Sequence, residues 1–211
     1  MTDWVTISAL ATGGGTLVLA VATFSSVRSA NRTARIAEQS LLIGMRPVLI
    51  PSREDDPVER VRFGDARTLT VPGHGAALEL GDGNVYMALA LRNGGAGLAV
   101  LHGWQASVPT VGQIPNRPDP EDFHRQQLDL YIPAGDTGFW QGAVRDDDDP
   151  HMSALRAAEQ SGERIVIDVL YGDHEGGQRT IARFGVTTDG ETEGRRAVAL
   201  RYWNLDRDDP R

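Results

Sequence analysis

The stretch "YMALALRNGGAGLAVLHGW", residues 86–104, sets three glycines between two apolar runs. A phosphate-binding loop after a strand opens a helix, whose amino terminus supplies the amides and the dipole. Here Leu98–Leu101 and then Gly103-Trp104 follow the glycines, a strand-like continuation, and the glycine spacing fits neither the dinucleotide nor the Walker pattern. Asn93-Gly94 is a turn signal, since both residues tolerate positive φ. We therefore predict a structural turn between two strands, with Gly94 and Gly95 at positive φ.

Outward from this turn, the residues beyond Pro47 follow a period of two. In "RIVIDVLYG", Ile165, Ile167, Val169 and Tyr171 share one face of a strand. Many short strands with little helix between them indicate a sandwich or barrel. The sequence predicts a mainly β, immunoglobulin-like antiparallel β-sandwich over residues 46–206, with one short helix near 150–161 and a tail at 207–211. The expected strands are "PVLIPS", "VERVRF", "RTLTVP", "AALEL", "NVYMALALR", "GLAVLHGWQASV", "QQLDLYI", "TGFWQGAV", "RIVIDVLYG", "QRTIARFGV" and "RRAVALRYW".

The amino-terminal part of the chain has a different character. Residues 4–27 contain no charged residue, and about 20 apolar residues in a helix cross a bilayer core of roughly 30 Å. We predict a transmembrane helix over 1–27 and a stalk helix over 28–45 that ends at Gly44 and Pro47. A buried soluble helix fits less well, because Gly13-Gly14-Gly15 weakens it. A cleaved signal peptide also fits less well, because Asp3 replaces a basic start.

Charge predicts the orientation of that helix. Arg28, Arg32, Arg35 and Arg46 follow the apolar stretch, and no arginine precedes it. The positive-inside rule then places the carboxy-terminal domain in the cytoplasm of a single-pass cell-membrane protein anchored by residues 4–27. Small residues four apart, such as Ala9 and Gly13, allow two such helices to pack as a homodimer.

Composition excludes several functions. The net charge of −8 argues against nucleic-acid binding, which needs a basic face. There is no cysteine, so disulfides, thiolate metal sites and cysteine nucleophiles are excluded.

Four short motifs resemble a family. They are Arg46-Pro47 before an apolar strand, the Asn93–Ala99 turn, the bend Ile132–Asp136, and the hairpin from Tyr171-Gly172-Asp173 to Gly177. In this pattern the chain is similar to uncharacterised bacterial membrane-anchored proteins with one amino-terminal transmembrane helix and an immunoglobulin-like sandwich. The resemblance covers most of residues 46–186. It implies a fold and no catalytic residues.

The usual catalytic signatures are missing from the sequence. There is no G-x-S-x-G elbow, and no two of the five histidines stand at the i, i+4 spacing of a helical zinc site. We predict no catalytic residue and no cofactor. Two acidic clusters are candidates for a divalent ion; the competing interpretations are a solvated loop whose Asp149 caps the following helix with Pro150 at N1, and an exposed polar turn. The candidate ligands are Asp146, Asp147, Asp148, Asp149, Asp173, His174 and Glu175.

Aromatic residues and one long loop complete the expectations. Trp104, Trp140, Tyr171 and Trp203 lie on predicted strands and should be buried. The proline-rich stretch 108–127 is the first place to look for a partner surface. The sequence favours a membrane-anchored β-sandwich module for protein–protein interaction, not an enzyme. The alternative is a Ca²⁺-assisted binding domain or hydrolase using loop 146–149, and a solute-binding sandwich would need a deep apolar pocket.

Overall fold

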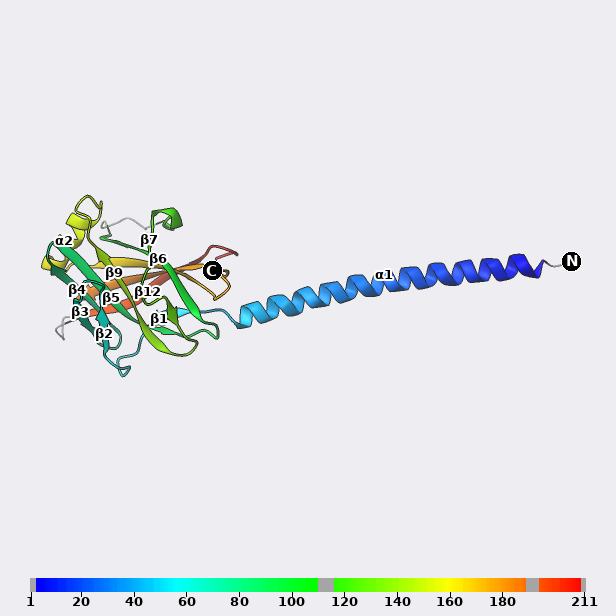
Figure 1. Ribbon diagram of the computed structural model, residues 1–211, viewed down its shortest axis with the longest axis horizontal. Helices are drawn as coiled ribbons and strands as arrows, with labels where there is room; N and C mark the ends of the chain where they lie inside the picture. Colours follow the sequence, from blue (N-terminus) through cyan, green and yellow to red (C-terminus); the bar gives the residue numbers. More distant parts are fainter. Residues whose placement is uncertain (1–2, 110–115, 189–193, 210–211) are drawn as a thin grey trace. The chain divides into compact units, whose positions relative to one another are not determined.

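The computed structural model describes residues 3–109, 116–188 and 194–209, and within the first helix it leaves out the side chains of residues 4–6, 9, 11, 39, 42 and 43. The chain forms two compact units, residues 1–44 and residues 45–211. Both units are drawn in Figure 1.

The first unit is one continuous helix, α1 (Trp4–Gly44), in place of the two helices predicted for 1–27 and 28–45. Its hydroxyl residues bond back to the preceding turn, as Thr16 Oγ1 does to the Thr12 carbonyl at 2.8 Å, so they stay helical. Among the residues that the structure describes, no helix is long and apolar enough to cross a membrane. The transmembrane helix predicted for residues 1–27 is therefore not confirmed. Three glycines and several hydroxyl residues lower the hydropathy of this stretch, and part of it lies outside the described side chains.

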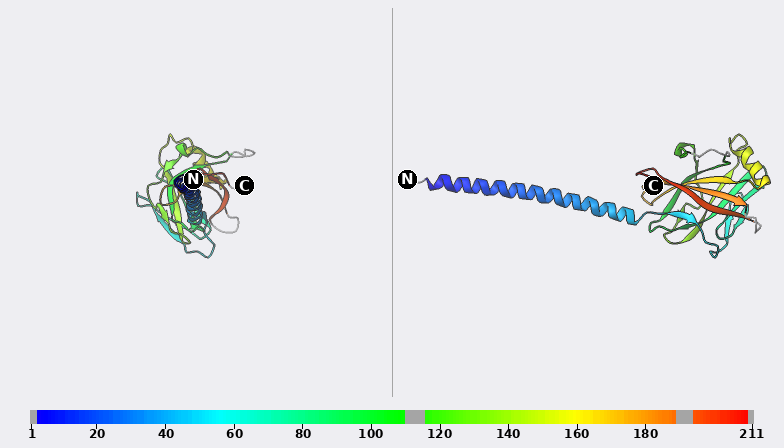
Figure 2. Two further views of the ribbon diagram at one scale, coloured as in Figure 1. Left: turned by 90° about the vertical axis from the view of Figure 1, so that its right-hand side faces the viewer. Right: turned by 180° about the vertical axis from the view of Figure 1, so that it is seen from behind.

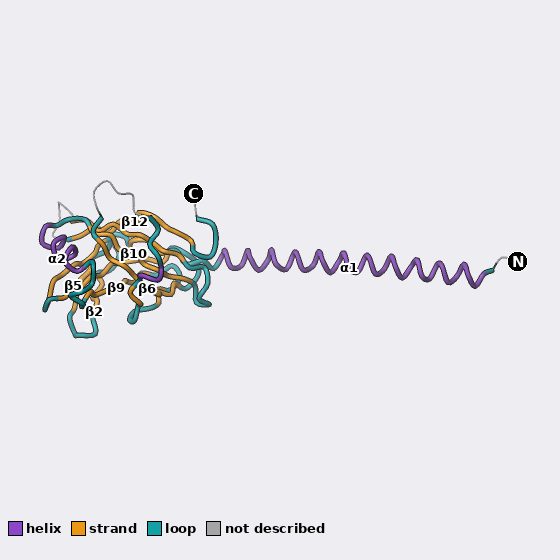
Figure 3. The backbone as a smooth tube through the Cα atoms, turned by 90° about the horizontal axis from the view of Figure 1, so that it is seen from above, coloured by secondary structure: helices purple, strands orange, loops and turns teal. Residues whose placement is uncertain are grey.

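The second unit is built almost entirely from antiparallel strands, which confirms the mainly β prediction (Figure 3). A ten-stranded sheet has the order β1-β5-β4-β12-β11-β10-β6-β7, with β9 on β5 and β8 on β6, and β2 pairs with β3 in a second sheet. The strands are β1 (Leu49–Pro51), β2 (Glu59–Arg62), β3 (Thr68–Val71), β4 (Gly75–Gly81), β5 (Asn84–Asn93), β6 (Ala99–Ser107), β7 (His124–Arg125), β8 (Tyr131–Ile132), β9 (Thr137–Val144), β10 (Ile165–Gly172), β11 (Thr180–Thr188) and β12 (Arg195–Asn204).

Between β12 and β4 only Arg195 and Arg196 pair, with Ala76 and Gly75. On the two halves of the sheet that this short pairing joins, Leu89 of β5 and Phe184 of β11 both belong to one apolar core. Contacts across this core also link β1 to the other half: the Leu49 amide donates to Tyr171 Oη at 3.3 Å, and Tyr202 Oη donates to the Leu49 carbonyl at 2.7 Å. Figure 2 shows β10 to β12, in yellow-orange to red, running together on one side of this unit.

Apolar residues also pack outside this core. Val61, Leu69 and Val71 of the small sheet pack on Tyr86 and Ala88 of β5, so β5 is buried on both sides. On the other half, Leu170, Ile181 and Trp203 form a separate apolar cluster. Beside it, Arg183 Nε and Nη2 donate to the two oxygens of Asp168 at 2.7 and 2.8 Å, an ion pair almost completely buried. The burial of Trp104, Trp140, Tyr171 and Trp203 predicted from the sequence is confirmed.

The short helix is α2 (Met152–Ser161), close to the predicted 150–161, and it lies at one end of the strands (Figure 1). Met152, Leu155 and Ala158 attach it to the core. The predicted cap is wrong: the N-cap is His151, with no side-chain cap, and Pro150 lies outside the helix. Asp149 Oδ1 instead accepts a hydrogen bond from the backbone amide of His151 at 2.8 Å, and the helix itself begins at Met152.

The glycine-rich turn joins β5 to β6 without any helix, which confirms the structural interpretation. The predicted positive φ is wrong, however, since neither Gly94 nor Gly95 has it. These glycines are required for close approach: a Cβ on Gly95 would lie 2.1 Å from the Arg46 carbonyl oxygen, and one on Gly97 would lie 1.7 Å from that of Met45. The chain at 45–48 therefore rests directly on the turn.

Asn93 holds this end of the unit together and is fully buried. Its Oδ1 accepts the amides of Val48 at 3.1 Å and Gly95 at 3.0 Å. Its Nδ2 donates to the carbonyls of Gly97 at 2.7 Å and Ile132 at 3.0 Å. Three of the four motifs that carry the family resemblance meet at this one side chain, so we call Asn93 and its partners the asparagine node.

Candidate functional site

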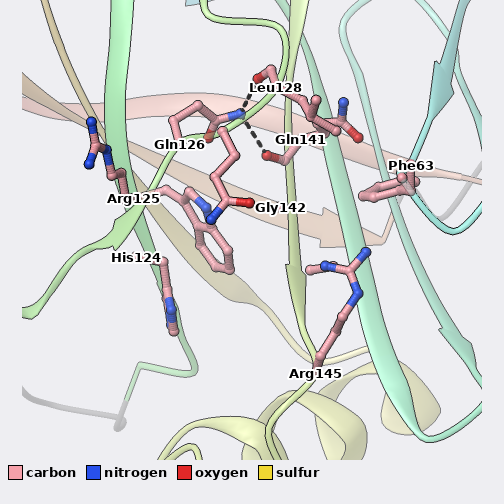
Figure 4. A pocket seen from close by; sticks show the side chains of 12 residues that line it. Phe63, His124, Arg125, Gln126, Leu128, Gln141, Gly142 and Arg145 are labelled. Atoms are coloured by element: carbon pink, nitrogen blue, oxygen red, sulfur yellow. Dashed lines mark hydrogen bonds between the residues drawn. The ribbon is translucent and has the colours of Figure 1, made fainter.

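A pocket of about 230 Å³ opens beside β9, between the segment 124–128 and the small sheet. Its lining comes from four parts of the chain: Phe63 and Gly64 after β2, Trp104 of β6, residues 124–128, and the residues 141–143 and 145 of β9 and its end. Figure 4 shows His124 and Arg125 along one side, Phe63 on the opposite side, and Gln126 above the space. The segment 124–128 includes the end of the 108–127 stretch singled out from the sequence, whose residues 110–115 lie outside the described part.

An aromatic stack forms the floor of the pocket. Trp104 and His124 face each other as partners of β6 and β7, with ring centroids 4.5 Å apart and planes at 30°. Trp140 meets Trp104 edge to face at 5.4 Å. His124 Nε2 lies 3.1 Å from Asp149 Oδ2, which fixes the ring from behind. Gly142 is necessary for this arrangement, because a Cβ there would lie 2.6 Å from Trp140 and 2.8 Å from Trp104.

Two buried glutamines give the pocket its unusual polarity. Gln126 Nε2 donates to the carbonyls of Leu128 at 2.8 Å and Gln141 at 3.1 Å, and Gln141 Nε2 donates to Asp129 Oδ2. Gln126 is 6% exposed and Gln141 4% exposed. Within the described part of the chain, neither amide oxygen has a hydrogen-bond partner. Buried acceptors without partners are uncommon in native proteins and often mark sites of ligand or water.

The lower edge of the pocket is a charged network around Asp65. Its Oδ2 accepts from Tyr86 Oη at 2.6 Å and from Arg145 Nη2 at 3.2 Å. The Tyr86 hydroxyl, and then Arg145, hold the pKa of the Asp65 carboxyl below its usual value. The Arg145 guanidinium also lies 5.6 Å from the centre of the Tyr86 ring. Arg145 remains half-exposed and lines the pocket.

The predicted metal ligands are placed in two separate regions. Asp147 pairs with Arg156 at 2.7 Å, Asp146 accepts the Asp148 amide at 3.0 Å, and Asp149 contacts His124. Across the described ranges, no three His, Asp or Glu side chains form a group able to hold a metal ion.

At the β10–β11 hairpin, the Asp173 carboxylate closes its own turn. It accepts the amides of Glu175 at 3.1 Å and Gly177 at 2.8 Å, and Gln178 Nε2 at 3.3 Å. His174 and Glu175 are exposed, 4.0 Å apart. The structure therefore gathers neither acidic cluster around a common point.

Sequence reasoning missed most of the pocket. Gln126, Gln141 and Arg145 belong to no motif, and Trp104 was predicted only as a core residue. The one available signal was the length and proline content of the 108–127 stretch. The short strand β7 at its end was also not predicted, because two residues carry no period.

Comparison of the chain with family models, with curated proteins and with solved structures finds no match. The resemblance to the bacterial membrane-anchored proteins therefore stays a prediction.

Proposed function

We propose that this chain is a membrane-anchored β-sandwich module that binds another protein through the pocket beside β9. The observation that carries the proposal is the pair of buried, unpartnered amide oxygens of Gln126 and Gln141 in a pocket with arginines on its sides. Such groups add nothing to stability while they are unpaired. A bound segment that donates to them gives them a role.

The anchoring part of the proposal is supported by the side chains of α1. Successive helical residues point about 100° apart, because there are about 3.6 residues in each turn. Leu17, Val18 and Leu19 nevertheless are exposed by 69%, 67% and 68%. These three residues therefore expose apolar surface all round one turn of α1, and such surface is normally covered, by protein or by lipid. Cover by lipid agrees with the lack of charged residues in the stretch 4–27. The small residues spaced four apart would allow a second copy of the helix to pack against it as well.

For the second unit we propose an immunoglobulin-like sandwich. Two halves of antiparallel strands face one core, and the core tryptophan Trp140 is fully buried between them. The arginines Arg28, Arg32 and Arg35, which follow the uncharged stretch of α1, support a cytoplasmic location for this unit under the positive-inside rule. A fluorescent protein fused after Arg211 should fluoresce, and a phosphatase that works only outside the cytoplasm should be inactive at the same point.

Anchoring is tested by removing residues 1–44. The full-length chain should sediment with membranes and resist alkaline extraction, whereas the shortened chain should stay in the supernatant. If the shortened chain still sediments, or if the full-length chain is released by alkali, α1 is not the anchor.

Partner binding is tested with a photo-crosslinking residue at Leu128, which lines the pocket and is 48% exposed. The full-length protein in its native membrane should give a discrete adduct with another protein. The matched control is the same residue at Val198 on β12, which is 40% exposed and does not line the pocket. Adducts of equal yield at both positions, or none at Leu128, would contradict the proposal.

The Ca²⁺-assisted alternative has no observation in its favour, since the carboxylates of Asp146, Asp147 and Asp149 are engaged by backbone amides, Arg156 and His124. It predicts a rise in melting temperature with millimolar Ca²⁺, and we expect none.

A further inference from the structure

The charge of the pocket is opposite to that of the whole protein. The chain carries 29 acidic and 21 basic residues. Among the described residues that line the pocket there are two arginines and a histidine, and no aspartate or glutamate. Asp65 pairs with Arg145, and Asp149 with His124, from outside the lining. Arg125 is therefore the lining cation without a paired carboxylate in the described residues, and it attracts ligands of the opposite sign.

The two arginines keep capacity for a ligand. Arg125 is exposed and has no ion-pair partner in the part of the chain that the structure describes. Arg145 contacts Asp65 at 3.2 Å, but that carboxylate is already held by Tyr86 at 2.6 Å. Figure 4 shows Arg125 and Arg145 on opposite sides of the pocket. A ligand with two spaced negative groups matches this arrangement better than a single anion.

The glutamines add a second requirement. Gln126 Nε2 donates to two carbonyls, so a flipped amide would set oxygen against oxygen, and the orientation is fixed. In the described residues, neither Gln126 Oε1 nor Gln141 Oε1 accepts a hydrogen bond, so each can accept one from a ligand. Both oxygens are buried, so a donor reaches them only if the pocket wall, which includes the exposed Gln127 and Leu128, changes conformation on binding. Sulfate offers only acceptors at neutral pH and inorganic phosphate has only its hydroxyl groups as donors, whereas a peptide offers several N–H groups beside its carboxylates.

Size and surroundings agree with a peptide. A volume of about 230 Å³ lies below the roughly 300–1,000 Å³ of pockets for drug-sized molecules, which suits one or two side chains. Phe63 and Trp104 supply apolar walls. In the described residues β9 pairs with β5 on one edge and with no strand on the other. At Gln141 that second edge is occupied by the Gln126 side chain, whose Nε2 donates to the Gln141 carbonyl.

We propose that the pocket binds an acidic segment of the partner protein, in which aspartate or glutamate carboxylates pair with Arg125 and Arg145 while neighbouring N–H groups donate to Gln126 and Gln141. This inference rests on the proposed function, and it names the chemistry of the partner. The carboxylate contacts give charge-assisted, bidentate hydrogen bonds. The amide contacts discriminate against anions that cannot donate.

The test is calorimetric titration of the full-length protein in detergent with the peptide acetyl-Gly-Asp-Gly-Asp-Gly-amide. Its matched control is the same peptide with asparagine in place of both aspartates. We expect the aspartate peptide to bind at least tenfold more tightly, and Arg125→Gln with Arg145→Gln to remove that preference. Arg60→Gln, at an exposed arginine of β2 that does not line the pocket, should keep it. If the double variant does not fold, Arg125→Gln alone should reduce the preference at least threefold.

Equal binding of the two peptides, no binding of either at millimolar concentration, or binding that ignores the arginine changes overturns the inference. Succinate and inorganic phosphate are titrated in parallel. If either binds as tightly as the aspartate peptide, the site takes small anions and the peptide assignment is wrong. If Leu128 forms an adduct but the peptide does not bind, the proposed function stands and the acidic-segment inference is wrong. If the peptide binds but Leu128 forms no adduct, the pocket recognises acidic peptides and the proposed function is wrong.

Discussion

The asparagine node and the pocket beside β9 are both built from buried side-chain amides, yet they treat those amides differently. At the node, Asn93 uses its oxygen twice and its nitrogen twice. At the pocket, Gln126 uses its nitrogen twice and its oxygen not at all within the described residues. A fully paired buried amide stabilises one conformation, and an unpaired acceptor stores a cost that only a ligand or water removes. The first pattern indicates structure. The second, a buried polar atom without a partner, also occurs at His102 Nε2 and Trp140 Nε1 in the described chain, and we propose binding for Gln126 and Gln141 because they line the pocket.

The largest effect should come from the close approach at the node. Gly97→Ala places a Cβ 1.7 Å from the Met45 carbonyl oxygen, so the backbone must move. We expect a loss of more than about 3 kcal/mol in the free energy of unfolding, at the upper end for overpacking. Urea denaturation measures it. The matched control is Gly94→Ala, whose Cβ would meet only a side-chain methyl at 3.4 Å; similar losses at both positions would show that close approach is not the reason for these glycines.

Removal of the node itself should follow closely. Asn93→Ala leaves two amides and two carbonyls without their side-chain partner, and each unpaired buried group costs about 1–3 kcal/mol before relaxation. We expect a net loss of about 3 kcal/mol, measured by the same denaturation. Asn93→Asp should also destabilise, because a carboxylate cannot donate to Gly97 and Ile132. A loss below about 1 kcal/mol in both variants would mean that water replaces the side chain.

A smaller effect is expected where the core meets the pocket. Gly142→Ala forces its Cβ to within 3 Å of Trp140 and Trp104, and side chains yield more easily than backbone. We expect a loss of about 1–2 kcal/mol together with a changed near-ultraviolet circular dichroism of the tryptophans. Unchanged tryptophan signals would show that the aromatic floor does not depend on this glycine.

The smallest effect should be a change in acid sensitivity. The Asp65 pKa is lowered in the folded state by Tyr86 and Arg145, so its contribution to stability is present above the unfolded value of 3.8 and is lost as pH falls through the folded value. Asp65→Asn should therefore flatten the decline of the melting temperature below about pH 4. Asp55→Asn, for which the carboxylate is exposed, is the control. A steeper decline in Asp65→Asn would reverse the sign of this argument.

The difference between the two regions also explains what the sequence could predict. Strands β9 and β10 were predictable almost residue for residue, because their residues follow a period of two and glycines bound them. The role of "NGG" as a turn was predictable from the strand-like residues that follow. The reason why glycines are needed there was not predictable, because it is the close contact of their backbone with residues 45–48. No local sequence pattern encodes where those residues lie in the fold.

The pocket was predictable only as a region. A long proline-rich stretch points to a surface, but Gln126, Gln141 and Arg145 come together through pairing between distant strands. Tertiary contacts also decided the role of Asp149, whose helix-cap pattern is local while its His124 partner is 25 positions earlier in the chain. Local patterns thus describe the elements well and their meeting points poorly.

The proposed difference between the structural amide of Asn93 and the binding amide of Gln126 is tested most directly by comparing Asn93→Ala with Gln126→Ala. Both variants are made in the full-length protein that carries the crosslinker at Leu128. For each variant, the free energy of unfolding and the adduct yield per folded molecule are measured together. We predict that Asn93→Ala loses about 3 kcal/mol with its adduct yield unchanged, while Gln126→Ala loses less than half as much stability and at least tenfold of the adduct. If Gln126→Ala instead destabilises as strongly as Asn93→Ala and its folded molecules still crosslink normally, the pocket amide is structural and the distinction between the two regions is wrong.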